Sequence, residues 1–211
     1  MNTPVIPSFR YQIFFLIMLM ALLNYIDRGA IAYASASILP EYGFDKADWG
    51  NVLGYFGYGY ILGALVGGIL ADRFGAKRVW LIAGGTWSIF EIATAFAGDF
   101  GLAFLGGSAM AGFATIRVMF GFAEGPAYSV INKSVANWAT PKERGFVVSV
   151  GLLSTPLGAL LTAPVAVGLQ TLTGDWRSMF VVLGVVSLAL LIFFMTRFTS
   201  TPDENPRVSK A

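Results

Sequence analysis

The sequence contains no cysteine and no histidine, and only 12% of its 211 residues are charged. Without cysteine the chain can form no disulfide bond and has no thiolate for metal binding or nucleophilic attack. Without histidine, proton transfer near neutral pH must use carboxylates. The net charge of +2 is spread over short segments rather than one basic patch, which argues against a nucleic-acid partner. We expect no metal, no cofactor and no enzymatic activity, because no ligand cluster or nucleophile–base pair is visible.

Hydrophobic residues dominate instead, at 56% of the chain with a mean hydropathy of +0.68. A soluble domain carries about 25% charged residues, so this composition indicates an all-α integral membrane protein. Six apolar segments are each long enough to cross a bilayer. They span residues 12–39, 49–71, 79–97, 102–128 (with a possible extension to 138), 146–172 and 178–194. The sequence therefore predicts a six-transmembrane-helix bundle over 11–197, a cytoplasmic tail at 1–10 and a disordered cytoplasmic loop segment or tail at 198–211.

The basic residues predict the orientation of these helices. Ten of the fourteen Lys and Arg residues fall on one side of the predicted membrane and two on the other. Short cytoplasmic loops are enriched in basic residues, so both termini should be cytoplasmic and the protein should lie in a plasma membrane, such as a bacterial inner membrane. The first group consists of Arg10, Arg73, Lys77, Arg78, Lys133, Lys142, Arg144, Arg197, Arg207 and Lys210.

Small residues and prolines predict how the helices pack. Gly59, Gly63 and Gly67 recur every four residues on the second segment, and Gly121 and Gly125 do so on the fourth. Such ridges let helix backbones approach closely in lipid. Pro126 should kink the fourth helix.

Five ionisable residues fall inside predicted spans, where charge is costly and points to function. They are Asp27, Arg28, Glu91, Arg117 and Glu124, and one added proton would neutralise the set. Arg117 and Glu124 stand two helical turns apart on one face, so they form either a functional pair or an ion pair that only joins helices. Glu91 remains open between a proton carrier, an arginine partner and a residue facing a wet crevice.

The residues near these charges suggest a ligand class. Arginine binds planar carboxylates bidentately, and Asn24, Tyr25 and Tyr60 add hydrogen-bonding groups. Arg28 and Arg117 with these side chains would suit a small, hydroxylated carboxylate. Charged residues also lie near mid-span in the first and fourth helices, which predicts two inverted three-helix repeats around a midplane site.

The loop after the second segment, Gly68-Ile-Leu-Ala-Asp-Arg-Phe-Gly-Ala-Lys-Arg78, resembles the signature loop between helices two and three of the major facilitator superfamily. The resemblance implies a cytoplasmic gate that opens and closes during alternating access. Its residues here would be Asp72, Arg73, Gly75, Lys77 and Arg78.

Three further stretches resemble the anion:cation symporter family, which includes sugar-acid/proton symporters. They are Asn24-Tyr-Ile-Asp-Arg28, Arg117-x3-Gly-x2-Glu124 with the following Gly-Pro, and Asp175-Trp-Arg177. The resemblance implies that Asp27 and Glu124 couple protons, and that Asn24, Tyr25, Arg28, Tyr60 and Arg117 serve the substrate.

Members of that family have twelve helices in two halves. The chain would then be the N-terminal half of a proton-coupled symporter for a hexonate, hexuronate or aldarate, and its C-terminal half would be missing. Two alternatives stay open. The first is an exporter or antiporter of the same fold, suggested by Ser154-Thr-Pro-Leu-Gly-Ala159, and the second is a non-transporting half-bundle that acts as an assembly partner.

Overall fold

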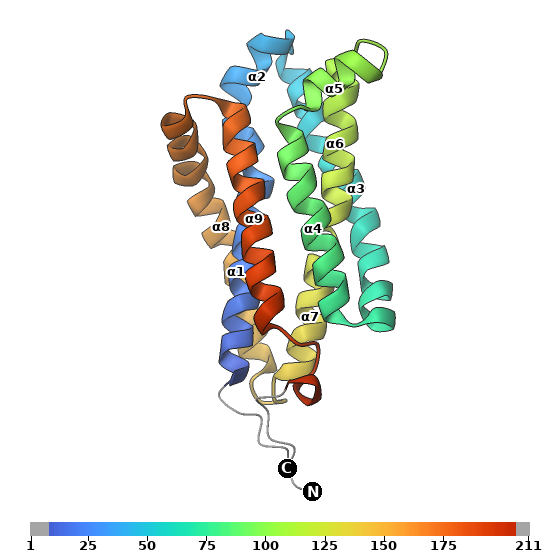
Figure 1. Cartoon of the computed structure of the whole chain (residues 1–211), viewed down its shortest axis with the longest axis vertical. Coiled ribbons are helices and arrows are strands. Elements are labelled where there is room, and N and C mark those ends of the chain that lie inside the picture. The colour runs from blue at the N-terminus through green and yellow to red at the C-terminus, as the bar shows by residue number, and fades with distance from the viewer. Residues whose placement is uncertain (1–8, 206–211) are drawn as a thin grey trace, which may run out of the picture.

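The structure is a computed structural model that describes residues 9–205 of the chain. The remainder of the predicted tails, 1–8 and 206–211, lies outside the described residues. Residues 9–205 form long helices joined by short turns, as Figure 1 shows. In chain order they are α1 (Phe9–Tyr33), α2 (Ser35–Tyr42), α3 (Lys46–Phe74), α4 (Ala76–Thr94), α5 (Ala97–Phe104), α6 (Ala109–Glu124), α7 (Ala127–Trp138), α8 (Arg144–Thr173), α9 (Trp176–Arg197) and the short 3-10 helix η1 (Pro202–Glu204).

The all-helical membrane bundle predicted from composition is confirmed. Among the described residues, α1, α3, α8 and α9 are each long and apolar enough to cross a membrane, and α4 with α5, bent by 77°, would make a fifth span. The remaining predicted span, the fourth in chain order, consists of α6 and α7. With 16 residues, α6 is about 24 Å long, so it falls short of a ~30 Å hydrocarbon core by itself.

The predicted start of the fourth span at residue 102 is wrong. Residues Ala97–Phe104 form the separate helix α5, and α6 begins only at Ala109. Gly106 and Gly107 take positive φ angles of 68° and 77° in the turn between them, a conformation that glycine adopts without strain. The hydroxyl of Ser108 then caps α6 by accepting the Ala111 N–H at 3.2 Å, which fixes the new start.

The predicted kink at Pro126 is confirmed as a break. Helix α6 ends at Glu124 and α7 starts at Ala127, with Gly125 and Pro126 between them. Proline lacks the backbone N–H that would continue the hydrogen-bond ladder. Pro156 and Pro164, by contrast, lie inside α8, which stays one helix.

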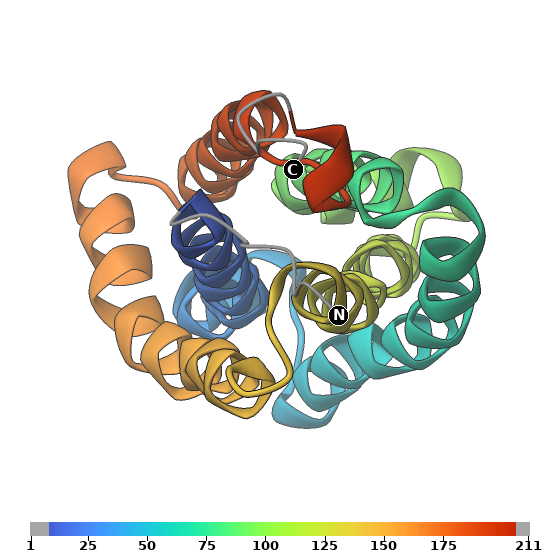
Figure 2. The same cartoon turned by 90° about the horizontal axis from the view of Figure 1, so that it is seen from below.

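Three helix pairs make the most extensive contacts: α1 with α8, α3 with α6, and α4 with α9. The view along the bundle in Figure 2 shows the same pairs side by side. A twofold repeat would exchange α1 with α6, α3 with α8, and α4 with α9. Under this exchange the pair α1–α8 becomes α6–α3, and the pair α4–α9 stays the same. The pairing therefore has the twofold pattern of two three-helix repeats, as predicted.

Glycine makes the α3–α6 pair close. A Cβ atom on Gly59 or Gly63 would collide with the backbone carbonyl of Val118 or Phe122, and one on Gly121 would collide with the carbonyl of Phe56. The predicted packing role of these ridges is confirmed, since only a glycine lets the two backbones touch.

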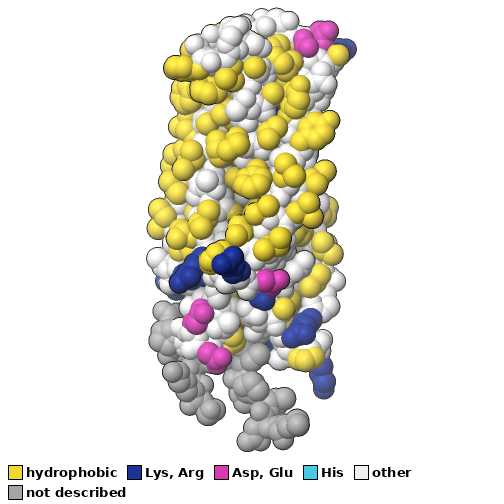
Figure 3. Space-filling view, turned by 90° about the vertical axis from the view of Figure 1, so that its right-hand side faces the viewer, with side chains coloured by type: hydrophobic (Ala, Val, Ile, Leu, Met, Phe, Trp, Pro, Cys, Tyr) yellow, Lys and Arg dark blue, Asp and Glu magenta, His cyan; other side chains and the backbone are white. Residues whose placement is uncertain are grey.

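The start of α1, the end of α9 and η1 lie at one end of the bundle, which we call the terminal end, and α2 and α5 lie at the opposite, distal end (Figure 1). Figure 3 shows one long face covered with hydrophobic side chains, with Lys and Arg side chains gathered toward the terminal end. This distribution suits a bundle whose middle lies in lipid.

The predicted disorder after residue 197 is wrong for residues 198–205. The Trp138 indole N–H donates to the Thr199 carbonyl at 3.0 Å, and the Asn137 amide donates to the Ser200 carbonyl at 3.0 Å. The Ser200 hydroxyl accepts the Lys77 N–H at 3.0 Å, and Phe198 stacks on Phe194. Polar composition suggested disorder, but these bonds hold the segment against α4, α7 and α9.

Candidate functional site

The five charged residues predicted inside the membrane gather in one cluster, the buried charge cluster, defined by Asp27, Arg28, Glu91, Arg117 and Glu124. They come from α1, α4 and α6. The three acids are fully buried, and Arg117 is 3% exposed. The side chain of Arg28 keeps 23% of its surface exposed, which makes it the most accessible charge of the set.

Glu124 pairs with Arg28 rather than with Arg117. The Arg28 Nε–H donates to Glu124 Oε2 at 3.1 Å. The predicted pair of Arg117 and Glu124 is therefore wrong as a direct contact, although both belong to the cluster. Two turns separate them along α6, whereas α1 brings Arg28 directly against Glu124.

Arg117 lies against aromatic rings instead. Its guanidinium carbon is 4.9 Å from the ring centre of Phe56 and 5.3 Å from that of Phe120. Its Nε and one terminal nitrogen have no hydrogen-bond partner among the described residues. Cation–π contact offsets part of the cost of burying this charge, and the nearby carboxylates of Glu91 and Glu124 interact with it electrostatically.

Asp27 accepts a hydrogen bond from the Ser187 hydroxyl of α9 at 2.5 Å. Its other carboxyl oxygen is buried without a partner in the described part of the chain. Ser187 was not predicted as a site residue. The signal was present, because it is the sole polar side chain between Met179 and Met195.

Glu91 interacts electrostatically with Asp27, Arg117 and Glu124. Its side chain is fully buried, and neither carboxyl oxygen has a hydrogen-bond partner in residues 9–205. A position on an open wet crevice is therefore excluded for this half. A proton carrier and an arginine partner remain.

The predicted polar residues surround Arg28. Its guanidinium carbon stands 4.8 Å from the Tyr25 ring centre and 4.5 Å from that of Tyr60. Asn24 is buried, and its amide nitrogen has no partner among the described residues. The structure thus brings Tyr25 and Tyr60 against Arg28, and Asn24 lies one helical turn before Arg28 on α1.

Sequence reasoning missed a chain of hydroxyl groups beside Tyr25. The Tyr128 hydroxyl on α7 lies 3.1 Å from that of Tyr25 and 2.8 Å from that of Thr155 on α8. No periodic pattern marks these three residues, since they come from three helices. They place hydroxyl groups next to the most accessible arginine.

The chemistry of the cluster follows from its charge balance. Three acids face two bases, and several of their buried polar atoms have no hydrogen-bond partner among residues 9–205. A buried carboxylate without a full set of partners favours the neutral, protonated form. The cluster can therefore hold a proton and offer an arginine to an anion. Among the described residues no three metal-ligating side chains lie close enough to hold a metal ion.

The predicted gate residues form a separate group at the terminal end, around the turn between α3 and α4. Asp72 is paired with Lys133 of α7 at 2.8 Å between Nζ and Oδ1. Gly75 has a φ of 81°, a conformation that explains why a glycine stands in this turn. Arg73, Lys77 and Arg78 follow along the same turn.

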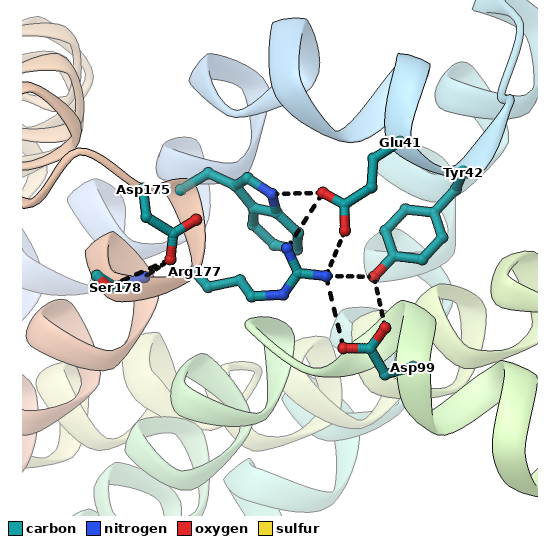
Figure 4. Close-up of polar contacts among 7 residues, drawn as sticks. Glu41, Tyr42, Asp99, Asp175, Arg177 and Ser178 are labelled. Carbon is teal, nitrogen blue, oxygen red and sulfur yellow. Dashed lines mark hydrogen bonds and ion pairs between the residues drawn. The ribbon is translucent and has the colours of Figure 1, made fainter.

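A second polar cluster joins the helix ends at the distal end, as Figure 4 shows. Arg177 of α9 forms an ion pair with Glu41 of α2 and another, at 3.5 Å, with Asp99 of α5. Its guanidinium also donates to the Tyr42 hydroxyl at 2.8 Å, and the Trp176 indole donates to Glu41 at 2.9 Å. The sequence resemblance singled out Trp176 and Arg177, but their acidic partners were not predicted.

Family comparison agrees with this architecture. The model of the Major Facilitator Superfamily matches residues 17–211. The chain belongs to the Major Facilitator Superfamily. The resemblance drawn from the α3–α4 turn is thereby confirmed.

Several curated relatives share this superfamily half. The hexuronate transporter of Bacillus subtilis (strain 168) is 31% identical over 92% of this chain and 43% of its own length. The probable galactarate/D-glucarate transporter GarP of Escherichia coli (strain K12) and the probable sulfoacetate transporter SauU of Cupriavidus necator are each 30% identical, over 95% of this chain and 44% of theirs. The chain spans about half the length of the curated relatives it matches.

Solved structures show the same fold. A bacterial homolog of the human lysosomal transporter Spinster, inward-facing and occupied, superposes with a TM-score of 0.82 at 18% identity, over 93% of this chain and 46% of the other. A D-xylose-proton symporter gives 0.72 at 21% identity, over 93% and 50%. This superfamily chain therefore has the fold of one six-helix half, as predicted.

Proposed function

We propose that the chain is the N-terminal half of a secondary transporter that carries a small organic anion, such as a hexuronate, hexonate or aldarate, together with protons. The observation that carries the proposal is the buried charge cluster, in which a partly accessible arginine is bonded to a fully buried carboxylate. The names of the relatives, which include hexuronate and galactarate/D-glucarate transporters, support the substrate class.

In this proposal Arg28 binds the substrate carboxylate, with Arg117 adding positive charge behind it. Arginine suits a carboxylate because its planar fork can donate two hydrogen bonds at once. The hydroxyl groups of Tyr25 and Tyr60 and the amide of Asn24 would bind the hydroxyl groups of a sugar acid. The second half of the transporter would supply the opposite wall.

Coupling follows from competition for Arg28. While Glu124 is ionised, its carboxylate occupies the Arg28 Nε–H. Protonation of Glu124 removes that negative charge, so Arg28 can donate its hydrogen bonds to the substrate carboxylate instead. Proton and anion then bind together, and loss of the proton on the other side of the membrane expels the anion. Asp27, held by Ser187, is the second proposed proton site.

The orientation is also a proposal. The basic residues at the terminal end support a cytoplasmic position for both termini, in a plasma membrane such as the bacterial inner membrane. Asp72, Arg73, Gly75, Lys77 and Arg78 would then belong to the cytoplasmic gate, closed against the second half.

The first prediction tests coupling at Glu124. In a transporter in which this chain is joined to a C-terminal half, we expect Glu124→Gln to abolish accumulation driven by an inward proton gradient. Exchange of labelled D-glucuronate or D-glucarate without a gradient should persist, because a neutral amide mimics the protonated acid.

Glu124→Asp is the matched control, since it keeps a titratable group and should retain part of the accumulation. Gradient-driven accumulation by Glu124→Gln at the level of the unmodified protein would contradict the proposed role. An exporter or antiporter would instead accumulate the anion only under an outward gradient.

A further inference from the structure

A groove of about 370 Å³ runs along the side of the bundle between α3, α4 and α6. Its rims are exposed hydrophobic side chains, including Val66, Ile82 and Phe122. Its floor contains the small residues Ala83 and Ala123. The groove is thus an open hollow on the apolar surface of the bundle. Its apolar lining differs from the charged residues of the buried charge cluster.

The wall of the groove offers almost no polar group. Thr86 lies in it, but its hydroxyl already donates to the backbone carbonyl of Ala83 at 3.2 Å, within its own helix. An ordered water molecule is not stable in such a site, because it needs two to four polar hydrogen-bond partners. An apolar chain is the chemical match for this lining.

One charged residue completes the lining, and it stands toward the terminal end. Arg78, in the first turn of α4, borders the groove next to Phe74 and Val79. It is exposed and forms no ion pair with any described acidic residue. The nearest acid in the sequence, Asp72, is paired with Lys133.

The surroundings reinforce this positive charge. Arg73 and Lys77 precede Arg78 in the same turn, and the one acid of that turn, Asp72, is already paired with Lys133. The amino end of α4 adds the positive end of a helix dipole. A ligand that fits both parts of the site has an apolar chain and an anionic head at the membrane surface.

We propose that this groove binds an anionic phospholipid, with one acyl chain in the groove and the phosphate at Arg78. Basic residues at the membrane surface attract anionic lipid by about 1 kcal/mol each, which corresponds to about a fivefold preference. The site is independent of the transported anion.

The test measures which lipid stays bound to the full chain. The chain is reconstituted in nanodiscs of mixed phosphatidylglycerol and phosphatidylcholine, and the retained lipid is counted by native mass spectrometry. We expect phosphatidylglycerol to be retained in preference, and Arg78→Gln to lower that preference about fivefold. Lys142→Gln, which removes an exposed base from the turn between α7 and α8, outside the groove lining, is the matched control.

A second pair of variants tests the groove itself. Val66 lines the groove and is 39% exposed, whereas Ile69 on the same helix is 70% exposed and lies outside the lining. Val66→Trp should fill the groove and reduce the retained phosphatidylglycerol, while Ile69→Trp should not. Both side chains face outward, so neither change disturbs the core.

Three outcomes would overturn the proposal. The first is equal retention of the two lipids by the unmodified chain. The second is an equal effect of Lys142→Gln and Arg78→Gln, which would indicate diffuse surface charge. The third is a dimer whose interface covers the groove, which would assign this face to a second copy of the chain.

Discussion

At the scale of single residues, the buried charges differ in what they contact. Glu124 has an arginine, Asp27 a serine hydroxyl, and Arg117 two aromatic rings. Glu91 has no hydrogen-bond partner among the described residues. An isolated charge in hydrocarbon has a high free-energy cost. Helices could pack without these charged groups, so packing does not explain their presence. These unpaired buried polar atoms support our proposal that the cluster is functional, because an ion pair that only joins helices would not need them.

The distal cluster gives a prediction about pH. Hydrogen bonds from the Arg177 guanidinium, helped by the Trp176 indole, hold the pKa of Glu41 below its ordinary value of 4.5. A carboxyl group whose pKa is lowered in the folded state stabilises the fold at pH values above its unfolded pKa. This contribution to stability is lost as the pH falls from the unfolded pKa through the folded-state pKa. Glu41→Gln should therefore destabilise the chain by roughly 0.2–1 kcal/mol near neutral pH.

The difference between Glu41→Gln and the unmodified chain should shrink as the pH falls below 4.5, because protonation removes the same ion pair. Thermal unfolding in detergent across that range measures it. Asp203→Asn, which removes an exposed acid, serves as the control and should change little. A constant difference at all pH values would mean that the ion pair does not contribute to stability.

At the scale of helices, glycine decides which elements touch. The α3–α6 pair depends on backbone contact, since a Cβ on Gly63 would collide with the Phe122 carbonyl. Nothing lies within 4 Å of a Cβ on Gly54, which stands on the same helix. The two positions are chemically identical, and only their neighbours differ.

We therefore expect opposite effects from the same substitution. Gly63→Ala should destabilise the bundle by about 1–3 kcal/mol, because the packed backbones must move apart. Gly54→Ala should be neutral or should stabilise it by up to about 1 kcal/mol, since alanine favours helix over glycine. Thermal unfolding followed by circular dichroism compares them, and equal effects would refute the close α3–α6 contact.

The segment 198–205 gives a second prediction for an element. Trp138→Phe removes the N–H that donates to the Thr199 carbonyl, at a cost of about 1 kcal/mol. Amide hydrogen exchange in this segment should accelerate. Trp80→Phe is the control for lost volume, because the buried Trp80 N–H has no partner among the described residues. Similar exchange in both variants would show that volume, not the hydrogen bond, holds the segment.

At the scale of the whole molecule, the chain has the fold of one half of a superfamily transporter, and it spans about half the length of its relatives. Alternating access in such folds moves two bundles around a site between them. In our proposal Arg28, the most accessible member of the cluster, lines that site, and this chain supplies one of its two walls.

The 211-residue chain by itself should therefore not accumulate labelled D-glucuronate or D-glucarate in proteoliposomes under an inward proton gradient. The hexuronate transporter of Bacillus subtilis in the same vesicles is the positive control. Accumulation by the chain alone would mean that two copies assemble into a complete transporter.

The sequence by itself determined the membrane class, the glycine ridges, the break at Pro126 and the identity of the charged residues. These features depend on local properties: the length of an apolar run, the spacing of small residues, and the missing N–H of proline. Only the tertiary structure decided the partners. Arg28 and Glu124 are 96 residues apart in the chain, and Asp27 and Ser187 are 160 apart. Such contacts depend on which helix faces meet. The spacing along α6 therefore predicted Arg117 as the partner of Glu124, whereas packing against α1 makes Arg28 the actual partner.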